Sequence, residues 1–256
     1  MTGGALQLAL GLLLSAGIGL SLGLIGGGGS IITVPVLVYV LGVPVDRAVA
    51  MSLAVVGSTA LVGALLHGRR GAVAWRTGAL FAGSGIVTAY LGSRLTRMVA
   101  PPVLLLIFAA LMLLVATVML TRNDPAAGAR PHPASMPRSV LSGLGVGFLT
   151  GFLGVGGGFL IVPALVLFGG LTMKEAIGTS LFVIAVNCAA GLFGHVTEGG
   201  VDGRLTLLVA SLAVAGALVG TALSHRVHPA GLRRIFAWFV VAVALFLIAR
   251  NYNAVL

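Results

Sequence analysis

The sequence predicts an all-α integral membrane protein, a bundle of about eight transmembrane helices in two pseudo-symmetric repeats. Two observations lead to this fold class. Hydrophobic residues make up 59% of the 256 residues and charged residues only 8%, whereas a soluble domain is about half apolar and about a quarter charged. The second half of the chain also repeats the first. A chain with so few charged residues cannot form the water-exposed surface of a soluble protein. Its high apolar content also excludes an intrinsically disordered chain.

Apolar stretches long enough to cross a bilayer recur along the chain. About 20 residues are needed, because a helix rises about 1.5 Å per residue and the hydrocarbon core is about 30 Å thick. In lipid the backbone has no other hydrogen-bond partner, so each stretch is expected to be helical. The stretches are 4–24, 47–66, 74–93, 102–121, 139–153, 175–194, 204–223 and 232–249.

Two shorter apolar pieces, 30–41 and 158–169, follow glycine clusters and are too short to cross alone. The connection 122–138 is rich in proline and charge, and it divides a first repeat, 1–121, from a second repeat, 139–256. The apolar N-terminal stretch lacks the basic start of a signal peptide and belongs to the repeat. It is therefore expected to stay in the mature chain.

The two halves align without a gap at a spacing of 128 residues. Apolar composition inflates chance matches of leucine, valine and alanine, but not of histidine, arginine, proline and a long glycine pattern. An internal duplication is therefore predicted. The aligned pairs include Gly17 and Gly145, Gly19 and Gly147, Gly23 and Gly151, Pro35 and Pro163, His67 and His195, and Arg76 and Arg204.

In each half a glycine-rich segment interrupts the apolar pattern, with GLIGGGGSIITVP at 23–35 and GFLGVGGGFLIVP at 151–163. Glycine runs hold a helix weakly, and each proline disfavours helical geometry in the residue before it. Upstream glycines spaced by four fit close helix packing instead. A duplicated bundle with a glycine-broken segment in each half is typical of secondary transporters.

Each short helix after a break would begin with unpaired backbone N–H groups at the positive end of its dipole. Without Cβ atoms in the way, an anion can approach these groups directly. The interiors of the long apolar runs hold no acidic residue that could bind a cation. We therefore expect a small-anion site near the middle of the bilayer, made by Gly26, Gly28, Gly29 and Ser30 and by Gly154, Gly156, Gly157 and Gly158.

Polar residues inside the helices are further candidates. For serine and threonine the alternative is a hydrogen bond to a carbonyl one turn back. His67 and His195 end their helices, where each either caps the helix or serves in proton coupling or as a gate. His225 and His228 are expected in a basic loop that faces lipid headgroups. The remaining substrate-binding candidates are Ser52, Ser180, Thr59 and Asn187.

Several classes of function are excluded by what the chain lacks. Its net charge of +10 lies in short loops without interleaved aromatic residues, so no nucleic-acid partner is expected. Cys188 is the single cysteine, which excludes an internal disulfide, a thiol relay and an iron–sulfur site. No lysine follows the glycine clusters as in a P-loop. No cofactor and no metal site are expected.

The paired glycine breaks, followed by TVP in one half and IVP in the other, resemble the sulfite exporter TauE/SafE family of membrane permeases. The resemblance covers about 11–250. It implies transport, often export, of sulfite, sulfonates or related sulfur oxyanions, in a multi-pass protein of the bacterial inner membrane. The halves differ at two of these positions. The first half has Ser30 where the second has Gly158, and it has Gly27 where the second has Val155.

Three function classes stay open: a secondary anion transporter coupled to protons or another ion, a passive anion channel, and an intramembrane enzyme. An enzyme would need a paired serine and histidine, but Ser52 and His67 lie at opposite ends of one helix, as do Ser180 and His195. Basic residues divide almost equally between alternate loops, which leaves the orientation open. The repeats are either parallel or inverted; opposed helix ends favour inversion. A homodimer is compatible with the sequence.

Overall fold

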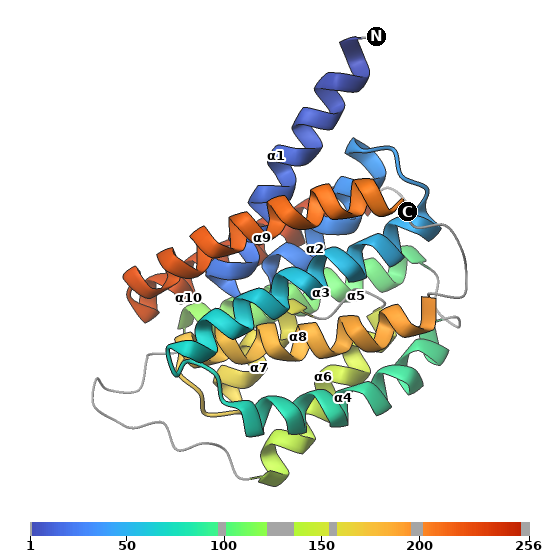
Figure 1. The fold of residues 1–256 in the computed structure, drawn as a ribbon. Coiled ribbons are helices and arrows are strands. Elements are labelled where there is room, and N and C mark those ends of the chain that lie inside the picture. The colour runs from blue at the N-terminus through green and yellow to red at the C-terminus, as the bar shows by residue number, and fades with distance from the viewer. Residues whose placement is uncertain (1, 97–100, 122–135, 154–157, 196–201, 252–256) are drawn as a thin grey trace.

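The computed structural model describes residues 2–96, 101–121, 136–153, 158–195 and 202–251, and their regular structure is helical (Figure 1). Every long apolar stretch of the sequence forms a helix where it is described. The elements are α1 (Thr2–Ile25), α2 (Gly28–Pro35), the π-helix η1 (Val36–Val40), α3 (Val45–Arg69), α4 (Trp75–Thr96), α5 (Pro101–Thr121), α6 (Met136–Leu153), α7 (Gly158–Leu167), α8 (Met173–His195), α9 (Gly203–Arg226) and α10 (Pro229–Asn251).

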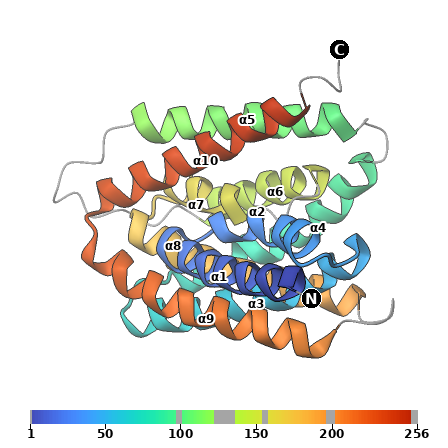
Figure 2. The ribbon, with the colours of Figure 1, turned by 90° about the horizontal axis from the view of Figure 1, so that it is seen from above.

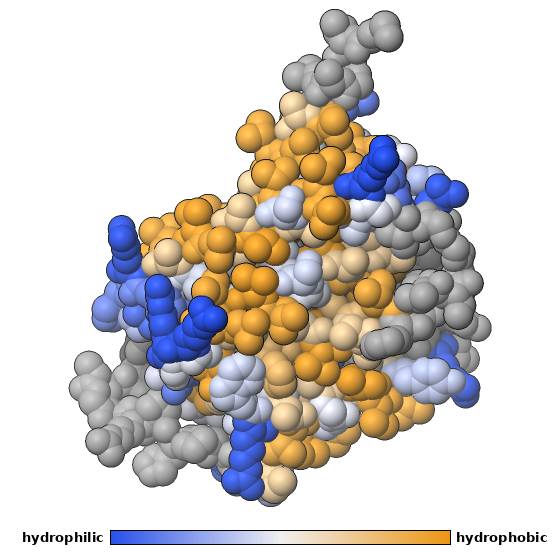
Figure 3. All heavy atoms as spheres, viewed as in Figure 1, coloured by the Kyte–Doolittle hydropathy of each residue, from blue (hydrophilic) through white to orange (hydrophobic). Residues whose placement is uncertain are grey.

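The chain is a multi-pass membrane protein. Apolar residues cover most of the face in Figure 3, and hydrophilic residues gather at its left and right margins. Such a surface suits lipid around the middle and water at the ends. Eight crossings remain a prediction. In the described part of the chain, five helices are long and apolar enough to span a bilayer: Gln7–Ile25, Arg47–Arg69, Met173–Leu192, Gly203–Arg226 and Pro229–Ala249.

The long helices pack in pairs that join the two halves of the chain. Helix α1 lies against α9, and α4 lies against α6. Helices α3 and α8 pack on each other, and α5 packs on α10. In Figure 2 the α5–α10 pair forms one edge, α3 and α9 form the opposite edge, and the short helices α2 and α7 lie between them. Each half therefore depends on the other for its packing.

Glycine lets the paired helices approach closely. A Cβ atom on Gly19 would overlap the carbonyl oxygen of Ala213 in α9, and one on Gly147 would overlap that of Gly85 in α4. Small residues at such crossings let two backbones touch, which is how helices associate in lipid. The packing role expected for the upstream glycines is confirmed for these crossings.

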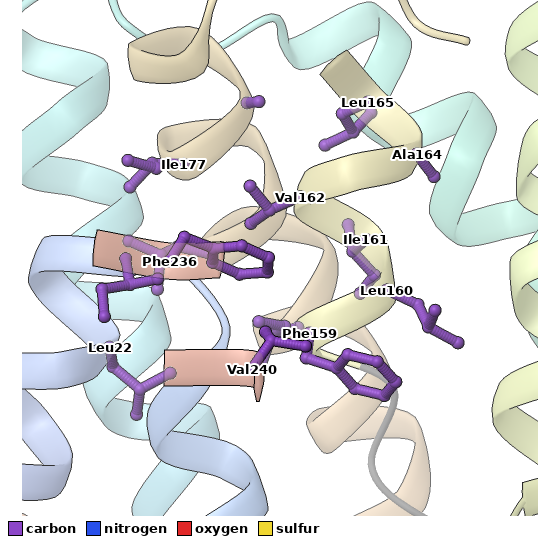
Figure 4. Close-up of a cluster of buried hydrophobic side chains, with 14 of the residues drawn as sticks. Leu22, Phe159, Leu160, Ile161, Val162, Ala164, Leu165, Ile177, Phe236 and Val240 are labelled. Atoms are coloured by element: carbon purple, nitrogen blue, oxygen red, sulfur yellow. The ribbon is translucent and has the colours of Figure 1, made fainter. Parts of the chain in front are cut away.

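Helix α7 lies at the centre of the molecule. All of its residues from Gly158 to Leu165 are buried. Figure 4 shows Phe236 and Val240 of α10 and Leu22 of α1 on one side of α7, which carries Phe159. A helix that is apolar on every face belongs in a core. The sequence pattern of α7 and its position therefore agree.

The short helices expected at 30–41 and 158–169 are present as α2 with η1 and as α7, and each of them contains a proline. Pro163 lies inside α7, and Pro35 is the last residue of α2, directly followed by η1. A proline within a helix removes one backbone hydrogen bond, and a π-turn is one way in which a helix accommodates the disturbance. The apolar packing around both segments compensates for the lost bond. The chain thus continues as helix through both prolines.

A glycine pair in α1 tests the packing role. Gly19→Ala places a methyl group against the backbone of α9, and overpacking of this kind costs about 1–3 kcal/mol. Gly17→Ala, two residues earlier, meets nothing within 4 Å and is expected to leave stability unchanged or raise it by up to about 1 kcal/mol. Thermal unfolding in detergent measures both. Equal midpoints for the two variants would contradict the close α1–α9 contact.

Candidate functional site

The break between α1 and α2 occurs at Gly26. Its φ of +82° lies in the left-handed region, which side chains with a Cβ avoid. The Gly26 N–H donates to the carbonyl oxygen of Leu22 at 2.8 Å and so closes α1. Helix α2 then begins at Gly28, with Gly27 as an N-cap that supplies no side-chain hydrogen bond. The first N–H groups of α2 have no capping side chain.

The two glycine breaks meet inside the molecule. A Cβ atom on Gly27 would overlap the carbonyl oxygen of Gly158, the first residue of α7, and one on Gly158 would lie 2.6 Å from Ser30 Oγ. Ser30 Oγ donates to the carbonyl oxygen of Gly27 at 2.8 Å. Gly28, Gly29 and Gly158 are buried. We call this region, Gly26–Ser30 with Gly158, the glycine junction.

Ser180 connects α8 to the glycine junction by a hydrogen bond. Its hydroxyl lies 2.8 Å from the carbonyl oxygens of both Gly26 and Ile177. The second of these bonds is the intrahelical bond that a serine in a membrane helix is expected to make. The first bond crosses from one half of the chain to the other. A single side chain thereby holds the α1 end of the break in place.

The other polar candidates lie apart from these contacts. Ser52 Oγ donates to Val49 O at 2.8 Å, the intrahelical alternative. Thr59 is 0% exposed, and its hydroxyl has no partner; a buried unsatisfied group costs about 1–3 kcal/mol. Asn187 Oδ1 is likewise buried without a partner. Gly154, Gly156 and Gly157 and the side chain of His195 lie outside the described residues.

His67 lies close to Gly23 and His225, two contacts that the sequence did not predict. It is 1% exposed, and its Nε2 lies 3.4 Å from the carbonyl oxygen of Gly23, one turn before the break. Its ring centroid is 4.9 Å from that of His225. Arg70 interacts electrostatically with both rings, and Lys174 with His225.

The expected loop position of His225 and His228 is wrong for His225. His225 belongs to the last turn of α9, because that helix extends beyond its apolar stretch and brings the ring onto α3. His228 is exposed between α9 and α10, and the Ala230 N–H lies 3.4 Å from its Nδ1. His228 therefore lies at the start of α10. No signal in the sequence could pair His67 with His225, since they lie on different helices.

A cavity of about 350 Å³ lies between α4, α6, α7 and α8. Most of its walls are apolar side chains, among them Phe81 and Ile161, while Thr150 and Asn187 are polar. Ile161 is one helical turn after Gly158, so the cavity adjoins the start of α7. Sequence reasoning missed Thr150 because an isolated threonine in an apolar helix carries no pattern.

The described interior of the protein contains few polar side chains and no acidic one. Its buried polar side chains are serine, threonine and one histidine, without aspartate or glutamate. No group of three possible metal ligands occurs among the described residues. Backbone N–H groups at the junction thus meet no competing carboxylate there.

The contact between Ser30 and Gly158 can be tested by a double-mutant cycle. Gly158→Ala brings a methyl group against Ser30 Oγ and is expected to destabilise the protein by about 1–3 kcal/mol. Ser30→Gly removes that hydroxyl, so the double variant should recover part of the loss, with a coupling of at least about 0.5 kcal/mol. Ser15→Ala, whose hydroxyl bonds Gly11 O instead, should combine additively with Gly158→Ala. Additivity in both pairs would contradict the contact.

Comparison with known proteins places the chain among membrane transporters. A family model described as "Sulfite exporter TauE/SafE" matches residues 11–247. A "Probable membrane transporter protein" of Xylella fastidiosa (strain 9a5c) is 34% identical over 242 residues, 92% of each chain. A "Probable membrane transporter protein YdhB" of Bacillus subtilis (strain 168) is 30% identical over 207 residues, 79% of this chain and 84% of the relative. No solved structure gives a significant match.

Proposed function

Because the chain belongs to the sulfite exporter TauE/SafE family, we propose that this membrane transporter is a secondary exporter of small anions, with sulfite or organosulfonates as substrates. The glycine junction is the binding site in this proposal. An intramembrane hydrolase would need a serine hydrogen-bonded to a histidine. In the described part of the chain no hydrogen bond joins these two residue types, so the structure gives the enzyme alternative no support.

The main support for the proposal is that the N-terminal ends of two helices lie close together. Helices α2 and α7 both begin with glycine, and Gly27 contacts Gly158 in the buried interior. Both helix dipoles therefore have their positive ends near the same place. Backbone N–H groups without neighbouring Cβ atoms can surround an oxyanion on several sides. Lipid or protein around the site strengthens such electrostatic contacts relative to water.

Inverted repeats agree with the helix pairing. At the shared spacing of 128 residues, α3 corresponds to α8, and these helices run antiparallel: Gly57 lies opposite Cys188, whereas Gly63 lies opposite Leu181. The α1–α9 contact likewise corresponds to the α6–α4 contact. Equivalent helices with opposite directions require a two-fold axis in the membrane plane. We therefore propose that residues 1–121 and 139–256 form inverted repeats around the junction, as in many transporters.

Binding of the substrate is tested by thermal stabilisation of the purified protein with sulfite, thiosulfate, sulfoacetate, taurine, sulfate and phosphate. A ligand at 100 times its dissociation constant adds about 2.7 kcal/mol, so a clear rise in unfolding midpoint with a sulfur oxyanion is expected.

Gly28→Val is the variant compared with the wild type in this experiment. The atoms nearest to its new Cβ belong to the side chains of Phe239 and Ser21, which can move, so the fold should persist while the anion shift is lost. An unchanged shift in Gly28→Val would contradict a backbone site at the junction. Saturable counterflow in vesicles separates a transporter from a passive channel, which shows none.

Proton coupling through His67 and His195 is the second part of the proposal. Histidine is the side chain whose charge changes most readily in the physiological range, so anion flux should depend on pH and should lose that dependence in His67→Gln/His195→Gln. Around His67, the groups that bear charge or titrate are His225, Arg70 and, beside His225, Lys174. The exposed His228→Gln is the control and should keep the wild-type profile. A wild-type profile in the double variant would assign both histidines a structural role.

A further inference from the structure

The cavity between α4, α6, α7 and α8 is more than a gap between helices. Its volume of about 350 Å³ falls in the range of small-molecule sites, about 300–1,000 Å³. A bare oxyanion of four heavy atoms needs far less, since one water takes up about 30 Å³. Thr150 and Asn187 bring polar atoms to walls that are otherwise largely apolar. Such a lining suits a ligand with a carbon skeleton and a polar end.

The duplication provides an internal comparison for this cavity. Each lining residue has a counterpart 128 residues away, and six of these counterparts are fully buried. Asn187 corresponds to Thr59, Cys188 to Ala60 and Thr150 to Leu22. These counterparts, together with those of Ile161, Val183 and Leu53, are all 0% exposed: Leu22, Thr33, Val55, Thr59, Ala60 and Leu181. The shared helix architecture therefore does not by itself create the cavity.

Side-chain differences account for the contrast between the halves. Both crossings are close, because Gly147 in α6 and Gly19 in α1 each touch the backbone of a facing helix. Beyond the crossing, the first half places the larger Leu22 where the second places Thr150. Leu22 packs in the core beside Phe236 and Val240 (Figure 4). The second half lacks that isobutyl group and keeps an open volume at the same position.

We propose that this cavity is a substrate chamber that holds the carbon skeleton of a small organic anion, with Thr150 as the residue that sets the permitted length. The inference rests on the proposed anion transport and extends it with a specificity-determining site. Ile161 in the wall is one turn from the start of α7, so a ligand in the chamber can direct its charged end towards the positive end of that helix dipole. Bare sulfite would leave the chamber unfilled.

A chain-length series tests the chamber. Methanesulfonate, ethanesulfonate and butanesulfonate are compared as stabilisers of the purified protein in lipid nanodiscs. The wild type should bind butanesulfonate at least about tenfold more tightly than methanesulfonate, since each buried CH₂ is worth about 0.8 kcal/mol. Thr150→Leu, which copies the first half, should abolish this gain and keep methanesulfonate binding. Thr150→Ser, which keeps the space, should behave as the wild type.

The native Cys188 supplies a second readout that does not require transport. Cys188 lines the chamber and is the single cysteine. It should be modified by the anionic reagent sulfonatoethyl methanethiosulfonate, followed by intact mass, and Thr150→Leu should slow the reaction at least about tenfold. Ala60→Cys in a Cys188→Ala background places the thiol at the closed counterpart. There the reaction should be at least about tenfold slower than at Cys188.

The outcomes separate the chamber from the proposed function. Equal affinity gains with chain length in wild type and Thr150→Leu, or equal reaction rates at positions 188 and 60, would overturn the chamber while leaving anion transport intact. Reaction of Cys188 with uncharged N-ethylmaleimide but with no charged reagent would assign the cavity to lipid and also overturn it. If none of the sulfonates and none of the inorganic anions binds the wild type, the proposed function fails instead.

Discussion

Backbone contact between helices is the constraint on which the rest of this structure depends. In lipid the hydrophobic effect does not drive helices together, and close packing has to supply the association. Gly19 against Ala213 and Gly147 against Gly85 bring the two halves to backbone contact. Only with those crossings in place can Gly27 reach Gly158 at the centre. A Cβ atom at any of these glycines would widen the bundle and separate the starts of α2 and α7.

Much of the helical structure follows from sequence, since the reasons for it are local. Apolar length and the demand for internal hydrogen bonding in lipid predict each long helix, and consecutive glycines predict the break at Gly26. The short apolar run at 158–169 also predicted helix across Pro163, although a proline disfavours helical geometry in the residue before it. There the surrounding core, with Phe159 and Leu165 fully buried, outweighs one missing backbone bond. At such positions the tertiary packing determines the local structure, and that packing cannot be deduced from a single sequence.

The candidate site was predictable in its residue types but not in its contacts. Ser52 and Ser180 occupy equivalent positions and both bond a carbonyl three residues back, as expected of serine in a helix. Ser180 makes a further bond to Gly26 that depends on where α8 crosses the break. The pairing of His67 with His225 similarly depends on how far α9 extends. Contacts between distant segments are set by helix crossings, which spacing along one chain does not reveal.

In the proposed transporter, two related halves with different interiors would let one fold combine a general site with a selective one. As the proposed binding site, the junction would offer mainly backbone N–H groups, which discriminate charge rather than shape. Selectivity among anions then has to come from side chains nearby. The halves differ there: Leu22 fills one position and Thr150 leaves its counterpart open. In this proposal, duplication would provide the opposed helix starts, and divergence at positions such as 22 and 150 would leave one half free to adapt to the rest of the solute.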